Sequence, residues 1–280
     1  MKPPPFAYHA PGSVEEAVEL LAEGNGTRVL AGGQSLVQQM KFRTARPTAL
    51  IDVNGIAGLD KIERRGDELH VGALARQQAL LEDPLVAECC PLLGEAARFV
   101  GYRETRRRGT LAGSLAFAAP WGELTAAAVA LDATVDVRSA GGERSIAARE
   151  LFLGPHQTAL KPHELIVGVR FPPAATGAGA AFHEVSDRYR DYAQVAAAAV
   201  VSPDGEADLV LLCVAPTPYH VDAARAIGEP EEGAIEELLA GIEPLDDVVA
   251  SASYRRRVAP VIARRALREA AERAGVRGVG

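Results

Sequence analysis

The chain has 280 residues, a formal net charge of −7 and 48% apolar residues. This length allows one large domain or two of ordinary size, with a substantial buried core. The negative charge argues against a nucleic-acid partner, because surfaces that bind phosphate backbones are normally strongly basic. No signal-peptide pattern and no apolar run of about 20 residues is found, so we expect a cytoplasmic protein that contacts no membrane.

The residue types that usually hold metal ions are sparse. Cys89, Cys90 and Cys213 are too few for a disulfide framework or a four-thiolate iron–sulfur site. The six histidines show no metal-ligand spacing. We therefore expect no metal site, and any redox cofactor in this chain to be organic.

The predicted elements begin with a helix and a strand that runs into a glycine-rich loop. Ser13 and Glu16 form a capping-box pattern, and Gly24 ends the helix that they begin. Residues 27–30 predict a short buried strand, which leads into the loop Ala31-Gly32-Gly33-Gln34-Ser35-Leu36.

The remaining elements fall on both sides of a predicted linker over 172–179, where the residues are small and flexible. Before the linker we predict strands or hairpins over 49–53, 60–73, 134–146 and 164–171, and helical segments over 75–100 (interrupted by Pro84 and Pro91) and 123–133. After it we predict antiparallel strands over 180–186, 193–201 and 207–215, then helices over 221–227, 234–239 and 254–274. This order indicates an α+β protein in two parts. The missing G-x-G-x-x-G spacing argues against a Rossmann domain.

A second glycine-rich loop, Gly109-Thr110-Leu111-Ala112-Gly113-Ser114, lies about eighty residues after the first. Glycine leaves backbone N–H groups unshielded, and phosphate oxygens need such an approach. One loop of this kind usually only closes a turn. Two in a single domain suggest a ligand with two phosphates, which indicates a dinucleotide.

Several motifs in a fixed order extend this pattern over essentially the whole chain. They are Phe6-Ala7-Tyr8, Leu30 to Leu36, Ile51-Asp52-Val53, Val71-Gly72-Ala73, Arg108-Gly109-Thr110-Leu111, Pro120 with Glu123-Leu124, and Asp191-Tyr192-Ala193. On these motifs the chain resembles the FAD-binding medium subunit of bacterial molybdenum hydroxylases, the xanthine dehydrogenase and aerobic carbon monoxide dehydrogenase group.

The resemblance implies a fold and a set of cofactor contacts. The fold would be a two-part vanillyl-alcohol-oxidase (PCMH-type) FAD-binding domain over 1–174, followed by an antiparallel sheet-and-helix domain over 180–280 like the C-terminal domain of CO dehydrogenase flavoproteins. Both loops would clamp the FAD pyrophosphate. Glu123 would accept hydroxyl groups from the adenosine part, and Tyr192 would lie beside the isoalloxazine ring, or else pack in the interdomain core. The implied cofactor-binding residues are Ala31, Gly32, Gly33, Gln34, Ser35, Leu36, Thr110, Leu111, Ala112, Gly113, Ser114, Glu123 and Tyr192.

The resemblance also implies partners. An iron–sulfur small subunit and a molybdopterin large subunit would complete a heterotrimer or its dimer, with [2Fe–2S] clusters and molybdopterin only in those chains. Electrons would reach FAD and pass to NAD⁺, oxygen, a quinone or another carrier, so no catalytic side chain is required here. Two alternatives stay open, namely a free-standing FAD-dependent oxidoreductase and a flavin-free assembly scaffold.

Several positions depart from the family pattern. Ala112 replaces a loop glycine, Ala119 an aspartate, and Trp121 a small residue, while Tyr102 and Arg190 replace histidine and glycine. These changes cluster around the expected cofactor site and leave the identity of the electron acceptor open. The arginine-rich run over 103–108 is either a docking site for an acidic partner or a solvated segment.

Overall fold

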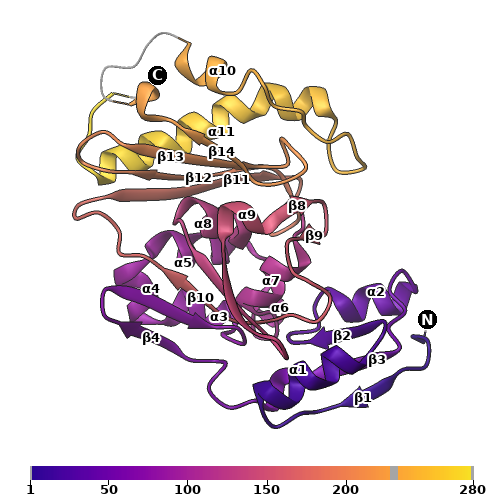
Figure 1. Ribbon diagram of the computed structural model, residues 1–280. Coiled ribbons are helices and arrows are strands. Elements are labelled where there is room, and N and C mark those ends of the chain that lie inside the picture. The colour runs from indigo at the N-terminus through magenta and orange to yellow at the C-terminus, as the bar shows by residue number, and fades with distance from the viewer. Residues whose placement is uncertain (1, 228–232, 279–280) are drawn as a thin grey trace.

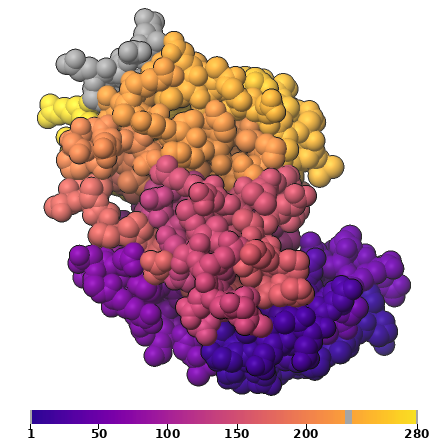
Figure 2. All heavy atoms as spheres, in the orientation of Figure 1, coloured from indigo at the N-terminus to yellow at the C-terminus, as the bar shows by residue number. Residues whose placement is uncertain are grey.

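The computed structural model describes residues 2–227 and 233–278. Its strands form a three-stranded, a five-stranded and a four-stranded sheet and one two-stranded ribbon. In Figures 1 and 2 the N-terminal lobe and the C-terminal part lie at opposite ends of the molecule, with the middle of the chain between them. This mixture of helices and strands agrees with the predicted α+β class.

The N-terminal lobe is a parallel sheet with the strand order β1-β3-β2. Its elements are β1 (Ala7–His9), α1 (Val14–Glu23), β2 (Thr27–Leu30), α2 (Leu36–Phe42), β3 (Ala49–Asp52) and the 3₁₀ turn η1 (Val53–Gly55). Ser13 caps α1 as predicted, since its Oγ accepts a hydrogen bond from the Glu16 N–H at 3.1 Å. Leu30 pairs with Asp52 at the carboxyl ends of β2 and β3. The first glycine loop and η1 therefore leave the sheet side by side.

The middle of the chain is an antiparallel sheet, β4-β5-β10-β6-β7, covered by short helices. The strands are β4 (Ile62–Arg65), β5 (Glu68–Gly72), β6 (Thr134–Ser139), β7 (Gly142–Ala147) and β10 (Leu165–Phe171), with a small ribbon of β8 (Phe152–Gly154) and β9 (Gln157–Thr158). The helical segment predicted over 75–100 consists of α3 (Gln77–Glu82), α4 (Pro84–Cys89) and α5 (Pro91–Phe99). Each proline occupies the first helical position, where its missing N–H costs nothing.

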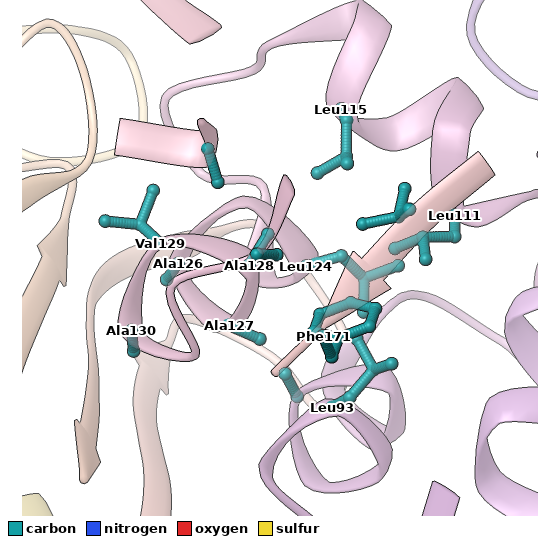
Figure 3. Close-up of a cluster of buried hydrophobic side chains, with 14 of the residues drawn as sticks. Leu93, Leu111, Leu115, Leu124, Ala126, Ala127, Ala128, Val129, Ala130 and Phe171 are labelled. Carbon is teal, nitrogen blue, oxygen red and sulfur yellow. The ribbon is translucent and has the colours of Figure 1, made fainter. Parts of the chain in front are cut away.

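Four more helices complete this middle part: α6 (Arg103–Arg106), α7 (Leu111–Phe117), α8 (Glu123–Ala130) and α9 (Ala148–Leu151). The sequence did not predict α7, because Gly113 and the neighbouring small residues read as a loop. Its buried residues, Leu111, Ala112 and Leu115, face the core instead. Figure 3 shows Leu111 and Leu115 pointing toward the cluster formed by Leu124, Leu93 and Phe171.

The C-terminal part is an antiparallel sheet with strands in chain order, β11 (Gly179–Ser186), β12 (Ala193–Val201), β13 (Ala207–Leu212) and β14 (Tyr219–Asp222). It also contains η2 (Ala224–Ala226), α10 (Ala234–Leu238) and the long α11 (Ala252–Arg273). Of the helix predicted over 221–227, only the short η2 is present, and the first two residues are strand. Tyr219 and Val221 alternate with polar residues and pair with Leu211 and Leu209, so this segment begins as the fourth strand.

This sheet lies between α11 on one face and α5 and α8 on the other (Figure 1). Alanine dominates both β12 and α8, and residues 124–130 of α8 are all buried. Small side chains let helix and sheet approach closely, so the seam between the parts is densely packed. Glu95 of α5 also pairs with Arg273 of α11 at 2.6 Å across it. The elements that carry the expected cofactor contacts therefore rest on a rigid core.

Candidate functional site

The first glycine loop connects β2 to α2, and its two glycines serve different purposes. Gly32 is buried against the second loop, where a Cβ would overlap the carbonyl oxygen of Arg108 and lie 2.8 Å from the Cα of Gly109. Gly33 has a φ of 74°, a backbone conformation that favours glycine. Ser35 precedes α2 and makes no capping hydrogen bond with its side chain. Gln34 is exposed, and Leu36 is the half-buried first residue of α2.

The second glycine loop is the start of helix α7. Thr110 is its N-cap residue, and its Oγ1 accepts a hydrogen bond from the Gly113 N–H at 3.0 Å. The Leu111 N–H donates to the carbonyl of Ala75 at 3.2 Å. The second residue of the helix, Ala112, has ordinary helical backbone, so a methyl group is accommodated where the family pattern has glycine. The two loops thus touch at their backbones, and the N–H groups of Leu111 and Gly113 in the second loop are already used within the protein.

Gln77 holds the second loop from the other side. Its backbone N–H donates to the carbonyl of Gly109 at 2.9 Å, and its side-chain Nε2 donates to Ser114 Oγ at 2.8 Å. A Cβ on Gly109 would overlap the Gln77 carboxamide, so a side chain at this position would displace Gln77 from the loop. Gln77 is 5% exposed, and its Oε1 is buried without a hydrogen-bond partner.

Two residues at the loop contact were not identified from the sequence. Asn54 Nδ2 donates to the carbonyl of Ala31 at 2.8 Å, and Arg76 donates to Asn54 Oδ1 at 2.7 Å and to the carbonyl of Arg108 at 2.8 Å. Asn54 comes directly after the Ile51-Asp52-Val53 motif, which pointed to this region. Arg76 belongs to no motif, and only the fold brings it to the loops.

An aromatic cluster lies at the other end of α7. The ring of Tyr192, just before β12, lies 4.9 Å from the ring of Trp121 at an interplanar angle of 43°. Trp121 also meets His156 edge to face at 5.8 Å. Tyr192 is 57% exposed, so it does not pack inside the interdomain core. Asp191 has a structural role in this loop, since its Oδ1 accepts the Tyr192 N–H at 2.9 Å.

The backbone around this aromatic cluster is strained. Six non-glycine residues in the described parts of the chain have positive φ, and four of them, Ala118, His156, Arg190 and Cys213, lie here. The N–H of His156 donates to Ala118, and the N–H of Cys213 donates to Pro120. Strain of this kind persists only where the surroundings hold it, and it gathers at functional sites. Arg190 adopts φ of 64° at the position where the family pattern has glycine.

Glu123 begins α8, two residues after Trp121, and faces the seam with the C-terminal sheet. Burial raises the pKa of Glu123 to about 7, although its own backbone N–H works in the opposite direction. Burial, and then the charge of Glu123, raise the pKa of Glu184 on β11 to about 9. The Oε2 atom of Glu184 is buried without a partner. Two carboxyl groups therefore lie near each other in the seam, and among the described residues neither forms an ion pair.

The predicted site residues thus follow the course of α7, which spans about 10 Å at 1.5 Å per residue. The glycine loops meet at its N-terminus, and Trp121, Tyr192 and Glu123 lie beyond its C-terminus. The arrangement offers backbone donors at one end, and an aromatic surface with a carboxyl group at the other. This suits an elongated ligand that carries phosphate in one part and a ring with hydroxyl groups in another.

Comparison with known proteins identifies that ligand class. Residues 4–174 match the family described as the FAD binding domain in molybdopterin dehydrogenase, and residues 180–270 match the CO dehydrogenase flavoprotein C-terminal domain. The chain belongs to the FAD-binding subunits of the molybdenum hydroxylases. The resemblance drawn from the sequence motifs is therefore confirmed.

Individual relatives of this family match the chain over nearly its whole length. The carbon monoxide dehydrogenase medium chain of Hydrogenophaga pseudoflava is 34% identical, covering 96% of this chain and 98% of that one. The 6-hydroxypseudooxynicotine dehydrogenase complex subunit alpha of Paenarthrobacter nicotinovorans is 37% identical, covering 98% and 97%. A solved structure of carbon monoxide dehydrogenase from Hydrogenophaga pseudoflava superimposes with a TM-score of 0.92 at 34% identity, covering 98% and 99%. The chain is therefore an oxidoreductase subunit with the fold of the molybdenum hydroxylase flavoproteins.

The residues present fit the FAD that this family binds. Gly32 leaves no room for a side chain between the loops, Gly33 holds a conformation that turns the backbone, and Glu123 offers a buried acceptor that forms no ion pair among the described residues. In the described residues no group of three or more His, Cys, Asp or Glu side chains is placed to hold a metal ion. Within those residues no helix is both long and apolar enough to cross a membrane.

Proposed function

We propose that this chain is the electron-transfer subunit of a three-subunit molybdenum hydroxylase. Electrons from [2Fe–2S] clusters of a small partner subunit would reach FAD here and pass to NAD⁺, oxygen, a quinone or another carrier. The observation that carries the proposal is the direct contact of the two glycine loops at Gly32 and Arg108, in a chain that matches flavoprotein medium subunits over nearly its full length. The domain division, with FAD bound by residues 1–174 and a second domain over 180–280, is part of this proposal.

The chain's own residues have binding and positioning roles. The loops Ala31 to Leu36 and Thr110 to Ser114 would hold the FAD diphosphate. The first would do so through backbone N–H groups and the Ser35 hydroxyl, and the second through the N–H groups of Thr110 and Ala112, because those of Leu111, Gly113 and Ser114 donate within the protein. Bound FAD would supply the one- and two-electron chemistry, and the protein its position and electrostatics. Because electron transfer through FAD needs no proton transfer at a side chain, no residue of this chain is given a catalytic role.

The structure also bears on the roles of Tyr192 and Glu123. From the sequence resemblance, Tyr192 would contact the flavin ring and Glu123 the adenosine, which lie on opposite sides of the diphosphate. In the fold both residues lie beyond the same end of α7, because Glu123 is two residues from Trp121 and Trp121 contacts Tyr192. We therefore propose that Tyr192 and Trp121 border the isoalloxazine ring and that Glu123 accepts hydroxyl groups of the ribityl chain next to it.

Gentle purification with cofactor analysis tests the subunit role. A tagged chain isolated from its native cells should carry FAD and retain two further chains. Iron and molybdenum should be found only when those chains are retained. Turnover of a small-molecule substrate by the purified single chain would instead support a free-standing oxidoreductase. A chain without any flavin spectrum would support an assembly scaffold.

A further inference from the structure

Arg76 lies directly beside the second glycine loop. Arg76 and Thr110 face each other in an isolated antiparallel bridge. The bridge is closed by the Gln77 N–H donating to Gly109 at 2.9 Å and the Leu111 N–H donating to Ala75 at 3.2 Å. In such a pair the side chains are close neighbours, so the guanidinium is held over the start of α7.

The guanidinium joins the two loops by hydrogen bonds. Its NH1 donates to the carbonyl of Arg108 at 2.8 Å, the same carbonyl against which Gly32 packs. Its NH2 donates to Asn54 Oδ1 at 2.7 Å, and Asn54 Nδ2 donates to Ala31 of the first loop at 2.8 Å. Asp52 Oδ1 accepts from both the backbone N–H and Nδ2 of Asn54, at 2.9 and 2.6 Å, which fixes the orientation of the amide.

The charge of Arg76 is not balanced by a direct ion pair. Among the described residues, none of the salt bridges within 4.0 Å involves Arg76 or Arg108. Both hydrogen-bond acceptors of Arg76 are neutral amide or peptide oxygens. Burial, and then the charge of Arg108, lower the pKa of Arg76, with Asp60 and Asp52 opposing at longer range. A half-buried cation with neutral partners strongly favours an anion beside it.

We propose that Arg76, positioned by Asn54, is the counter-charge for the diphosphate of the bound cofactor and ties the two loops into one anion site. This inference rests on the proposed role of the loops in holding FAD. It assigns the phosphate specificity of the site to a side chain outside both glycine motifs. Arg108 adds a second positive charge next to it.

Binding measurements with three ligands separate a charge role from a structural one. The variant Arg76→Met should bind FAD about tenfold or more weakly, since a charged hydrogen bond contributes about 1.5–3 kcal/mol. Riboflavin, which has no phosphate, should bind the variant and the wild type equally. ADP, which carries the diphosphate, should bind the variant more weakly by a factor similar to that for FAD. The matched control is Arg28→Met, which removes the same charge from an exposed position on β2 without touching either loop and should leave all three affinities unchanged.

Each outcome decides the inference. Equal weakening of FAD and riboflavin would show that Arg76 only supports the fold, and unchanged FAD binding would show that it does not contact the diphosphate. If Arg76→Met does not fold, Arg76→Gln removes the charge while keeping a donor, and the same FAD-to-riboflavin comparison applies. If the wild-type chain itself does not bind FAD, the proposed function of the loops fails together with this inference. If Gly33→Ala loses FAD but Arg76→Met does not, only this inference fails.

Discussion

Gly32 packs directly against the carbonyl of Arg108, so that one peptide of the first glycine loop rests on the peptide that begins the second. A Cβ at residue 32 would overlap that oxygen and lie 2.8 Å from the Cα of Gly109. The two loops are about eighty residues apart in the chain, yet they form a single surface. Any change that separates them should affect the ligand they share.

The first prediction concerns this contact. Gly32→Ala should separate the loops and weaken FAD binding by at least about tenfold, because the neighbouring atoms are backbone and cannot rotate away. Titration of the apoprotein with FAD, followed by flavin fluorescence, measures the effect. Gly141→Ala is the matched control, since the nearest atom to its Cβ would be Ser139 Oγ at 3.6 Å. Normal FAD affinity in Gly32→Ala would contradict the shared surface.

Substitution of Gly33 should also weaken FAD binding, but for a different reason. Its φ of 74° makes alanine unfavourable by about 1 kcal/mol even where space allows. Gly33→Ala should therefore reduce FAD affinity, since the loop relaxes toward negative φ and its N–H groups turn away. Gly66→Ala carries the same backbone penalty, with φ of 61°, in a hairpin turn with open space around it. That control should lose stability without losing FAD affinity, as measured by denaturation and by flavin titration.

Local signals predicted the elements that depend on neighbours in the chain. The Ser13–Glu16 pair marked the start of α1, and Pro84 and Pro91 marked the starts of α4 and α5. These residues act within one helical turn, so their effect can be read from spacing alone. The first glycine loop was found in the same way, because a strand, two glycines and a serine are consecutive.

Features that depend on tertiary packing could not be predicted in this way. The end of β14 lies in a segment predicted as a helix, because only its pairing with β13 makes it a strand. Arg76 contacts the loops only because β5 and α3 bring it opposite Thr110. The carboxyl groups of Glu123 and Glu184 are sixty-one residues apart and meet only in the seam between the two parts of the molecule. In each case the deciding partner lies far away in the sequence.

The third prediction concerns Glu123 and pH. Hydroxyl donors from bound FAD favour the ionised carboxylate, whereas burial favours the protonated form and raises the pKa of Glu123 to about 7. FAD affinity should therefore rise as pH increases toward 7 and level off above it. Glu123→Gln should bind FAD more weakly at pH 8 and lose this pH dependence. An unchanged pH profile in the variant would assign the effect to another group.

Ligand fragments locate the contact of Glu123 within the cofactor. If it accepts ribityl hydroxyl groups, Glu123→Gln should weaken riboflavin and FAD by the same factor and leave ADP binding unchanged. If it contacts the adenosine ribose instead, ADP and FAD should weaken together. A neutral hydrogen bond contributes about 1 kcal/mol and a charged one about twice that, so the expected change is about five- to thirtyfold.

The fourth prediction tests the strained backbone at Arg190. This residue holds φ of 64°, and its NH1 donates to the carbonyl of Gly101 at 3.0 Å. Arg190→Ala loses the hydrogen bond but keeps the strain, whereas Arg190→Gly loses the hydrogen bond and removes the strain. The glycine variant should therefore be more stable than the alanine variant by about 1 kcal/mol in urea denaturation. Equal stabilities would show that the backbone at this position relaxes without cost.

The last prediction concerns Glu184, whose carboxyl group lies in the seam near Glu123. Its folded-state pKa of about 9 is far above the ordinary value of 4.5, so between these values the folded protein binds more protons than the unfolded chain. Stability should therefore be greatest below about pH 4.5 as far as this group is concerned, and fall as pH rises toward 9. Glu123 contributes a slope of the same sign only up to about pH 7.

Of these two groups, only Glu184 still changes the stability between pH 7 and 9. There the free energy of unfolding should fall by up to about 1.4 kcal/mol for each pH unit. In that interval Glu184→Gln, which mimics the protonated acid, should lose the slope and exceed the wild type in stability by more than about 1 kcal/mol at pH 9. Glu206→Gln, in an exposed turn, should keep the wild-type slope. Denaturation at pH 7, 8 and 9 measures the difference, and parallel curves for Glu184→Gln and the wild type would show that the seam admits enough water to keep Glu184 ionised.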